Sequence, residues 1–371
     1  MASPSDGRSH FIDYGKAIII LIVIMTHFKA PFLDVGAFNM MFFFFASGYV
    51  QKKGGRSFGE STKRRFRAII VPFWYATLIL GLLEIPRAYY FGYGDFRIFL
   101  LPILNAIYGS GHLPYLGPIS DYINSLKQFH PDGVEGFTDV IVPMTCHLWF
   151  LPAMFVASVL FYLYINKLRK GLWTDIVAIV VLCLLAFTDS VSAAQFPYAI
   201  GRGFWGCAGM VAGYAAKEYA IFTYGKRRIP IFLITAAIGI SFALIGFTTC
   251  MMGIVSYYGP YGPLSVMLTV IGGVSSSIAF CYLLYGLERL LKGHDSFICL
   301  IGRNTMPLYL WQLPVISALS IALLLITQTP PHFDFSMVAL LPDEWVFWKY
   351  FLMVITASSI LLTCKATRRL H

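Results

Sequence analysis

Long apolar stretches recur along this 371-residue chain, and they restrict its fold more than any other feature. A helix crosses a bilayer in about 20 mostly apolar residues, with a range of about 17 to 25. Within lipid a chain has to satisfy its backbone hydrogen bonds internally, as helices do. The sequence therefore predicts an all-α polytopic membrane protein of about ten transmembrane helices. The predicted spans are residues 17–33, 35–50, 68–83, 146–165, 172–187, 199–216, 229–247, 263–284, 305–326 and 345–363.

The composition supports this prediction. Hydrophobic residues make up 58% of the chain and charged residues 12%, whereas soluble domains carry about 25% charged residues. The net charge of +10 is spread over short basic runs between apolar stretches, so we expect no nucleic-acid binding. The seven cysteines show no pairing pattern or metal-ligand spacing, so we expect no metal site and no tightly bound cofactor. We expect one transmembrane domain over residues 1–371, with no attached soluble domain.

The basic residues predict the orientation, because cytoplasmic loops of membrane proteins are enriched in Lys and Arg. With ten spans and the N-terminus inside, most of the 28 basic residues fall on the cytoplasmic side, as do both termini. Residues 84–145 then form a long external segment between the third and fourth helices. Its apolar part, 98–108, is short for a span and is interpreted as a re-entrant or interfacial piece. The segment is either a lid over an external site or a passive connector.

The first predicted span contains His27, and Asp13 and Lys16 come just before it. Lys16 and His27 are almost three helical turns apart, so they share one helix face and are separated by about 16 Å along the axis. With a span beginning at residue 17, His27 falls near the bilayer midplane and Lys16 at its cytoplasmic mouth. Ionisable residues within a span suggest a functional site. Alternatively, Lys16 follows the positive-inside rule, Asp13 caps the helix, and His27 bonds to a neighbouring helix.

Five sequence blocks in this order resemble one family of membrane enzymes. The first is Asp13-x-x-Lys16 followed by His27, and the others extend the match to about Pro314. Together they resemble the acyltransferase 3 family of multi-spanning membrane acyltransferases, in particular its fucose 4-O-acetylase-like sugar O-acetyltransferases. The other blocks are the aromatic run 42–49 with Ser-Gly-Tyr, the basic loop 63–67 leading into 71–74, the stretch 147–151 with Trp-Phe, and residues 301–312.

Two positions depart from the family's pattern. The subgroup often has His where this chain has Asn39, and many members have His where it has Gln312. Both changes remove an imidazole. They leave His27 as the main candidate for a general base, a role in which a positioned His contributes about 10²–10⁴-fold to the rate.

The resemblance implies acyl transfer from a cytoplasmic acyl-CoA to an acceptor hydroxyl on the outer side. The implied catalytic residues are His27 as base and Asp13, which orients Lys16 or caps the helix. Arg and Lys bind phosphates, so the basic cluster is assigned to coenzyme A, although it also suits topology or anionic lipid. The implied coenzyme A residues are Lys16, Arg64, Arg65 and Arg67, and the implied acceptor residues are Ser47, Asn39, His147, Trp149, Tyr309 and Gln312.

Alternatives remain open at several positions and for the function. His147 and Trp149 also fit an interfacial aromatic belt, and Arg202 is either a buried partner or snorkels outward. We expect a bacterial inner (plasma) membrane O-acetyltransferase with acetyl-CoA as donor substrate and a carbohydrate or lipid-linked glycan as acceptor. Its other partners are membrane lipids, and a homo-oligomer is compatible with the sequence. The rivals are a polysaccharide or solute exporter without acyl chemistry, which predicts matched inverted halves not found here, and a structural or sensory protein.

Overall fold

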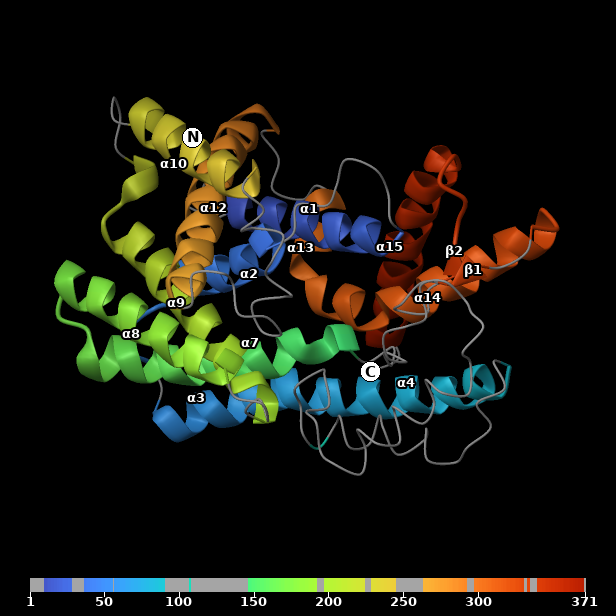
Figure 1. Cartoon of the computed structure of the whole chain (residues 1–371), viewed down its shortest axis with the longest axis horizontal. Helices are drawn as coiled ribbons and strands as arrows, with labels where there is room; N and C mark the ends of the chain where they lie inside the picture. Colours follow the sequence, from blue (N-terminus) through green and yellow to red (C-terminus); the bar gives the residue numbers. More distant parts are fainter. Residues whose placement is uncertain are drawn as a thin grey trace.

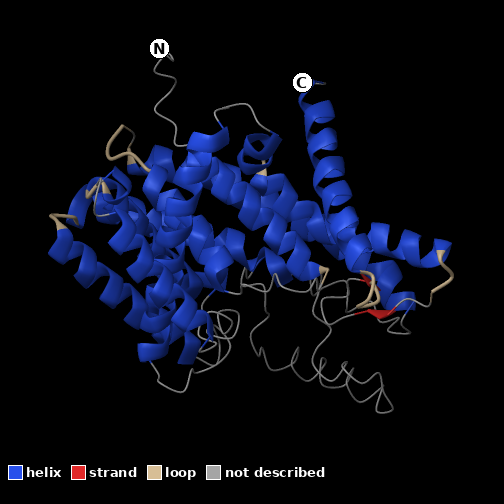
Figure 2. Ribbon diagram, turned by 90° about the horizontal axis from the view of Figure 1, so that it is seen from above, coloured by secondary structure: helices blue, strands red, loops and turns tan. Residues whose placement is uncertain are grey.

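The computed structural model describes residues 10–28, 37–55, 57–90, 107, 146–191, 197–223, 228–244, 263–291, 297–329, 332–333 and 339–369. Within these residues the regular structure is helical, apart from a short antiparallel pair between β1 (His332–Phe333) and β2 (Ala339–Leu340). Figure 1 shows the helices packed against one another, and Figure 2 shows how little strand there is. The predicted helical architecture is confirmed.

Each predicted apolar stretch forms a helix. Among the described residues, six helical segments are long and apolar enough to cross a membrane, and three shorter apolar helices accompany them. The count of ten spans therefore stays a prediction. The helices are α1 (His10–His27), α2 (Ala37–Val50), α4 (Val71–Tyr90), α7 (Phe150–Leu163), α8 (Leu172–Val191), α9 (Ile200–Glu218), α10 (Arg228–Leu244), α12 (Pro263–Leu291), α14 (Thr305–Ile326) and α15 (Val346–Arg369).

Short elements join or extend these helices. The helix α3 (Phe58–Arg65) starts at a capping box, in which the Ser57 hydroxyl accepts from the Glu60 N–H and the Glu60 carboxylate accepts from the Ser57 N–H. It runs through a π-helical turn (Phe66–Ile70) into α4. A second π-helical turn (Tyr164–Leu168) follows α7. Short 3-10 turns lie at Cys146–Trp149, Pro197–Ala199 and Ile221–Thr223. The helix α13 (Phe297–Arg303), which the sequence does not predict, precedes α14.

The helix α9 packs against α2, α7 and α8. Small residues make these contacts close: a Cβ at Gly48 of α2 would fall on the Met210 carbonyl oxygen, and one at Gly213 would fall on the Phe45 carbonyl oxygen. Small residues let membrane helices approach closely in this way. Although it falls in a predicted span, α9 is not among the segments apolar enough to span. Because so much of it faces other helices, it needs little apolar surface for lipid.

The structure corrects the predicted position of the first helix. It begins at His10, not at residue 17, and ends at His27, so this histidine lies at the helix end and not near its middle. Apolar content alone places the start too late, because Asp13 and Lys16 are polar. The helix can include Asp13 because its carboxylate is buried against α13, where Arg303 pairs with it.

Several ends that the ten-span topology places on the cytoplasmic side lie together. The ring of Phe11, at the start of α1, contacts Tyr49 at the end of α2 with centroids 5.6 Å apart. It also contacts Phe222 after α9 and Tyr285 late in α12, at 5.8 and 5.9 Å. The ends of these helices therefore share one face. The predicted external segment 84–145 begins as the last residues of α4, and its re-entrant piece 98–108 lies outside the described residues except Ile107.

Candidate functional site

Asp13 begins the polar face of α1. Its side chain is buried, and Arg303 Nε at the end of α13 lies 3.6 Å from Asp13 Oδ2. A Cβ at Gly302 would fall on the Asp13 carbonyl oxygen, so α13 and α1 are in close backbone contact. Because α1 begins at His10, Asp13 lies within its first turn and is not the predicted cap, and the pair with Arg303 gives it a positioning role instead. Residue types alone do not reveal the pair, because the partners are far apart in the sequence.

Lys16 and His27 are both half-buried on the same unbroken helix. Because α1 is helical throughout, the predicted common face and separation of about 16 Å hold. The last turn of α1 belongs to a second apolar cluster, in which Ile24, Met25 and Phe28 pack with residues of α14 and α15. His27 therefore lies where these three helices meet.

Buried polar side chains gather on α14 and α15 near this junction. Neither amide atom of the fully buried Gln312 has a hydrogen-bond partner among the described residues, and the same holds for the hydroxyls of Ser317, Ser320 and Thr356. Ser317 and Ser320 share a helix face with Leu313 and Leu324, which pack in the cluster at the end of α1. An unsatisfied buried polar group costs about 1–3 kcal/mol. Such groups are suited to a polar ligand.

Asn39 and Ser47, the predicted acceptor residues of α2, lie at opposite ends of their helix. Asn39 is buried near its start, and its Oδ1 also has no hydrogen-bond partner among the described residues. Ser47 is half-buried one turn from the C-terminal end, beside the close contact of Gly48 with α9. The structure therefore does not bring these two residues to one place.

Trp149 and Tyr309 belong to one aromatic group centred on Phe150. The Phe150 ring lies 5.4 Å from the Tyr309 ring, 6.1 Å from the Trp149 ring and 5.1 Å from the Phe44 ring. Trp149 is only 6% exposed, so it packs inside the protein and is not part of a lipid-facing belt. Its ring stacks on the Arg202 guanidinium, which makes Arg202 a buried partner and not a snorkelling residue. The side chain of His147 lies outside the described residues.

The predicted coenzyme A cluster separates into two kinds of arginine. Arg65 Nη1 donates to the Ser158 carbonyl oxygen at 2.5 Å, and Nη2 donates to Gln51 Oε1 at 2.9 Å. These bonds tie α3 to α7 and to the end of α2. Arg64 and Arg67 are exposed. The arrangement leaves Arg64 and Arg67 open to a phosphate, while Arg65 has a structural function.

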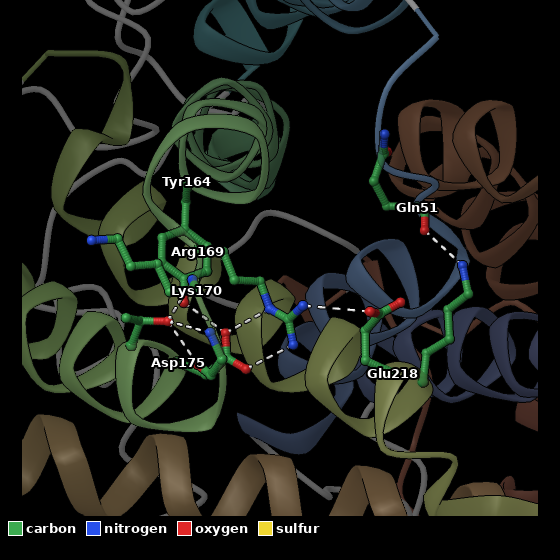
Figure 3. Close-up of polar contacts among 9 residues, drawn as sticks. Gln51, Tyr164, Arg169, Lys170, Asp175 and Glu218 are labelled. Atoms are coloured by element: carbon green, nitrogen blue, oxygen red, sulfur yellow. Dashed lines mark hydrogen bonds and ion pairs between the residues drawn. The ribbon is translucent and has the colours of Figure 1, made fainter.

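A second polar network joins the end of α7, the start of α8 and the end of α9 (Figure 3). Arg169 binds the buried Asp175 through two hydrogen bonds of 2.9 and 3.0 Å, and the Tyr164 hydroxyl donates to Asp175 at 2.6 Å. Burial lowers the pKa of Arg169, but the hydrogen bonds and charge of Asp175 outweigh burial and raise it. Lys217 Nζ donates to the Gln51 carbonyl oxygen at 2.8 Å. The network therefore ties the end of α7 to the start of α8, and Lys217 ties α9 to the end of α2.

Together these features define a multi-pass helical membrane protein with polar side chains inside its helix bundle. In the part of the chain that the structure describes, no three His, Cys, Asp or Glu side chains come together as a metal site requires.

Residues 9–364 match the model of the acyltransferase 3 family, which is described as an acyltransferase domain. The match covers nearly the whole chain, so the protein belongs to this family and is a membrane acyltransferase. No curated protein and no solved structure gives a significant match to the chain. The fucose 4-O-acetylase-like subgroup stays a prediction.

Proposed function

We propose that this protein is a membrane O-acetyltransferase that moves an acetyl group from cytoplasmic acetyl-CoA to a hydroxyl of a carbohydrate or lipid-linked glycan. The observation that most supports this proposal is the polar face of α1, which the half-buried Lys16 and His27 share. His27 is the last residue of the helix and lies beside α14, whose buried polar groups have no hydrogen-bond partner among the described residues. The family supplies the reaction class. The donor and the acceptor class follow from the resemblance to the family's sugar O-acetyltransferases, and the chemistry of these residues is compatible with both.

The transfer step uses His27 as the general base. A hydroxyl is a weak nucleophile at neutral pH and gains reactivity when a positioned imidazole removes its proton. The hydroxyl oxygen attacks the thioester carbonyl carbon, so a C–O bond forms as the C–S bond breaks. The proton taken by His27 then goes to the leaving thiolate of coenzyme A. The buried amide of Gln312 and the hydroxyls of Ser317 and Ser320 offer hydrogen bonds to the acceptor.

The donor is held in the N-terminal half of α1. Lys16 offers a point charge on the same helix face as the base, and Arg64 and Arg67 offer exposed guanidinium groups for phosphates. Asp13 and Arg303 fix the helix that carries Lys16. In this assignment Arg65 supports the basic surface through its bonds to Gln51 and Ser158 and does not bind coenzyme A itself.

Purified protein in proteoliposomes tests the reaction. The protein is supplied with [¹⁴C]acetyl-CoA on one side and a panel of glycans on the other, and label on the glycan is measured. We expect label on the glycan with release of free coenzyme A in equal amount. Glycan crossing the bilayer unlabelled and without acetyl-CoA would instead establish the exporter.

A further inference from the structure

A cavity that the proposed reaction does not use lies between α13 and the C-terminal part of α15. Its volume is about 550 Å³, which is within the range of about 300–1,000 Å³ found for ligand pockets. Phe297 and Leu300 of α13 line one side, together with Asn304, which directly follows that helix. The cavity is therefore large enough for a ligand and is bounded by two helices that are far apart in the sequence.

The other side of the cavity is a single stripe of α15. Ser358, Leu361, Leu362 and Lys365 line it. Their spacing of three and four residues places them on one face of the helix. This part of α15 belongs to a segment that is long and apolar enough to cross a membrane and that ends at Lys365. The cavity therefore lies where a predicted span reaches the membrane surface.

The lining combines apolar side chains with a cation at one end. Phe297, Leu300 and Leu362 are large, apolar and exposed, and the Asn304 amide donates to the Leu300 carbonyl oxygen at 2.7 Å. Lys365 is exposed, and in the ten-span topology it lies on the cytoplasmic side. The cytoplasmic leaflet carries anionic lipids, and basic pockets between transmembrane helices on that side bind anionic headgroups. This lining matches a ligand with a hydrocarbon chain and an anionic head.

The helix α13 connects this cavity to α1. Gly302 makes the close contact with the Asp13 carbonyl oxygen of α1. It is two residues from Leu300, which lines the cavity, so the two residues are about 200° apart around the helix axis. One face of α13 thus packs on α1 and the opposite face borders the cavity. A ligand in the cavity would therefore hold α13, with its pair between Arg303 and Asp13, against α1.

We propose that the cavity between α13 and α15 binds an anionic phospholipid of the cytoplasmic leaflet. One acyl chain lies along the apolar side chains of the two helices, and the headgroup phosphate pairs with Lys365, which binds phosphate as a point charge. The bound lipid stabilises the position of α13 and, through it, of α1. This inference does not depend on the acetyltransferase reaction, because it would hold for an exporter as well.

Native mass spectrometry of the purified full-length protein tests the selectivity for lipid. The protein in detergent is titrated with dioleoyl phosphatidylglycerol or with dioleoyl phosphatidylcholine, which share their acyl chains and differ in net charge. We expect the first phosphatidylglycerol to bind about fivefold more tightly or better, because one Lys near an anionic headgroup is worth about this factor. Lys365→Gln should lower the preference by about fivefold. Lys52→Gln, which removes an exposed cation outside the cavity, should leave it unchanged.

Cys364 reports where the lipid binds, because it lines the cavity, is half-buried and forms no disulfide. Its reaction with N-ethylmaleimide is followed by peptide mass spectrometry in nanodiscs of phosphatidylcholine alone, or of equal parts phosphatidylcholine and phosphatidylglycerol. We expect phosphatidylglycerol to slow the labelling of Cys364 by about threefold or more, and Lys365→Gln should abolish this protection. Lys53→Cys places a reference thiol at an exposed position outside the cavity, which corrects for the effect of membrane charge on thiol reactivity.

Three results would overturn the inference. The first is equal affinity of the wild type for the two lipids, and the second is a preference for phosphatidylglycerol without protection of Cys364. The third is protection of Cys364 by palmitoyl-CoA but not by phosphatidylglycerol, which would assign the cavity to an acyl-CoA donor. Because the wild-type protein alone gives each of these results, the test does not depend on the folding of a Lys365 variant.

Discussion

At the scale of single residues, some polar side chains fix helices to one another and others lie on the polar face of α1. Asp13 is paired with Arg303, Asp175 with Arg169, and Arg65 is held by carbonyl and amide oxygens. Lys16 and His27 share the remaining polar face of α1. The spacing of Asp13, Lys16 and His27 is readable from the sequence because one helix carries all three.

Contacts between side chains that are far apart in the sequence were not predictable from it. Arg303 meets Asp13 only because a short helix, α13, packs its glycine against the backbone of α1. Arg202 reaches Trp149 through the packing of α9 on α7. The buried hydroxyls of α14 resemble ordinary helix serines in sequence, and only their lack of a hydrogen-bond partner among the described residues distinguishes them.

Neutralising Lys16 tests its assignment to the donor. We expect Lys16→Gln to raise KM for acetyl-CoA about tenfold, because a lost charge-assisted hydrogen bond is worth about 1.5–3 kcal/mol and 1.4 kcal/mol is tenfold in affinity. KM for the acceptor should change by less than about twofold. Steady-state kinetics with each substrate varied in turn measure both values. Equal weakening for donor and acceptor would remove Lys16 from the donor site, and Lys16→Arg is the charge-preserving control.

At the scale of elements, close contacts between helices decide where the polar faces lie. Apolar content predicted the long apolar helices, because both the protein interior and the lipid favour apolar residues, but it did not predict the short helices α3 and α13. It did not predict the start of α1, where tertiary pairing of Asp13 overrides polarity. The sequence also did not predict that α9 packs against α2, α7 and α8. The glycine spacing of one helix shows that a close contact is possible, but it does not identify the helix that makes the contact.

Enlarging Gly48 tests the α2–α9 contact. The added methyl group of Gly48→Ala would meet the Met210 carbonyl oxygen, and overpacking of this kind costs about 1–3 kcal/mol. We expect a lower thermal unfolding midpoint in detergent. Gly286→Ala is the matched control, because Gly286 lies in α12 with no atom near the added Cβ. Replacing this helical glycine with alanine favours the helix by about 0.5–1 kcal/mol, so the midpoint of the control should not fall. Equal midpoints for the two variants would refute the close contact.

At the scale of the whole molecule, the charge distribution and the packing of helix ends point to the same arrangement. The start of α1 and the ends of α2, α9 and α12 meet through the rings around Phe11, as the basic loops predict. The side of the membrane that this face occupies is inferred from the positive-inside rule. The match to the acyltransferase 3 family runs through all of these helices.

Cysteine labelling tests the orientation. In a cysteine-free background, we expect Lys53→Cys and Lys365→Cys to resist a membrane-impermeant maleimide in intact spheroplasts and to react after permeabilisation, because both lie on the predicted cytoplasmic side. Gln328→Cys, in the turn after α14, should react in both conditions. All three side chains are exposed, so access to the protein surface is not limiting. The reverse pattern would invert the topology.

The central claim is that the imidazole of His27 takes the proton from the acceptor hydroxyl. The most direct measurement is the kcat of acetyl transfer by His27→Ala. Thr26→Val is the control, because the Thr26 hydroxyl donates to the Ile22 carbonyl oxygen of its own helix. We predict a fall of about 10²–10⁴-fold for His27→Ala, an unchanged melting temperature, and near-normal activity for Thr26→Val. A folded His27→Ala protein that acetylates its acceptor at the wild-type rate would contradict the account.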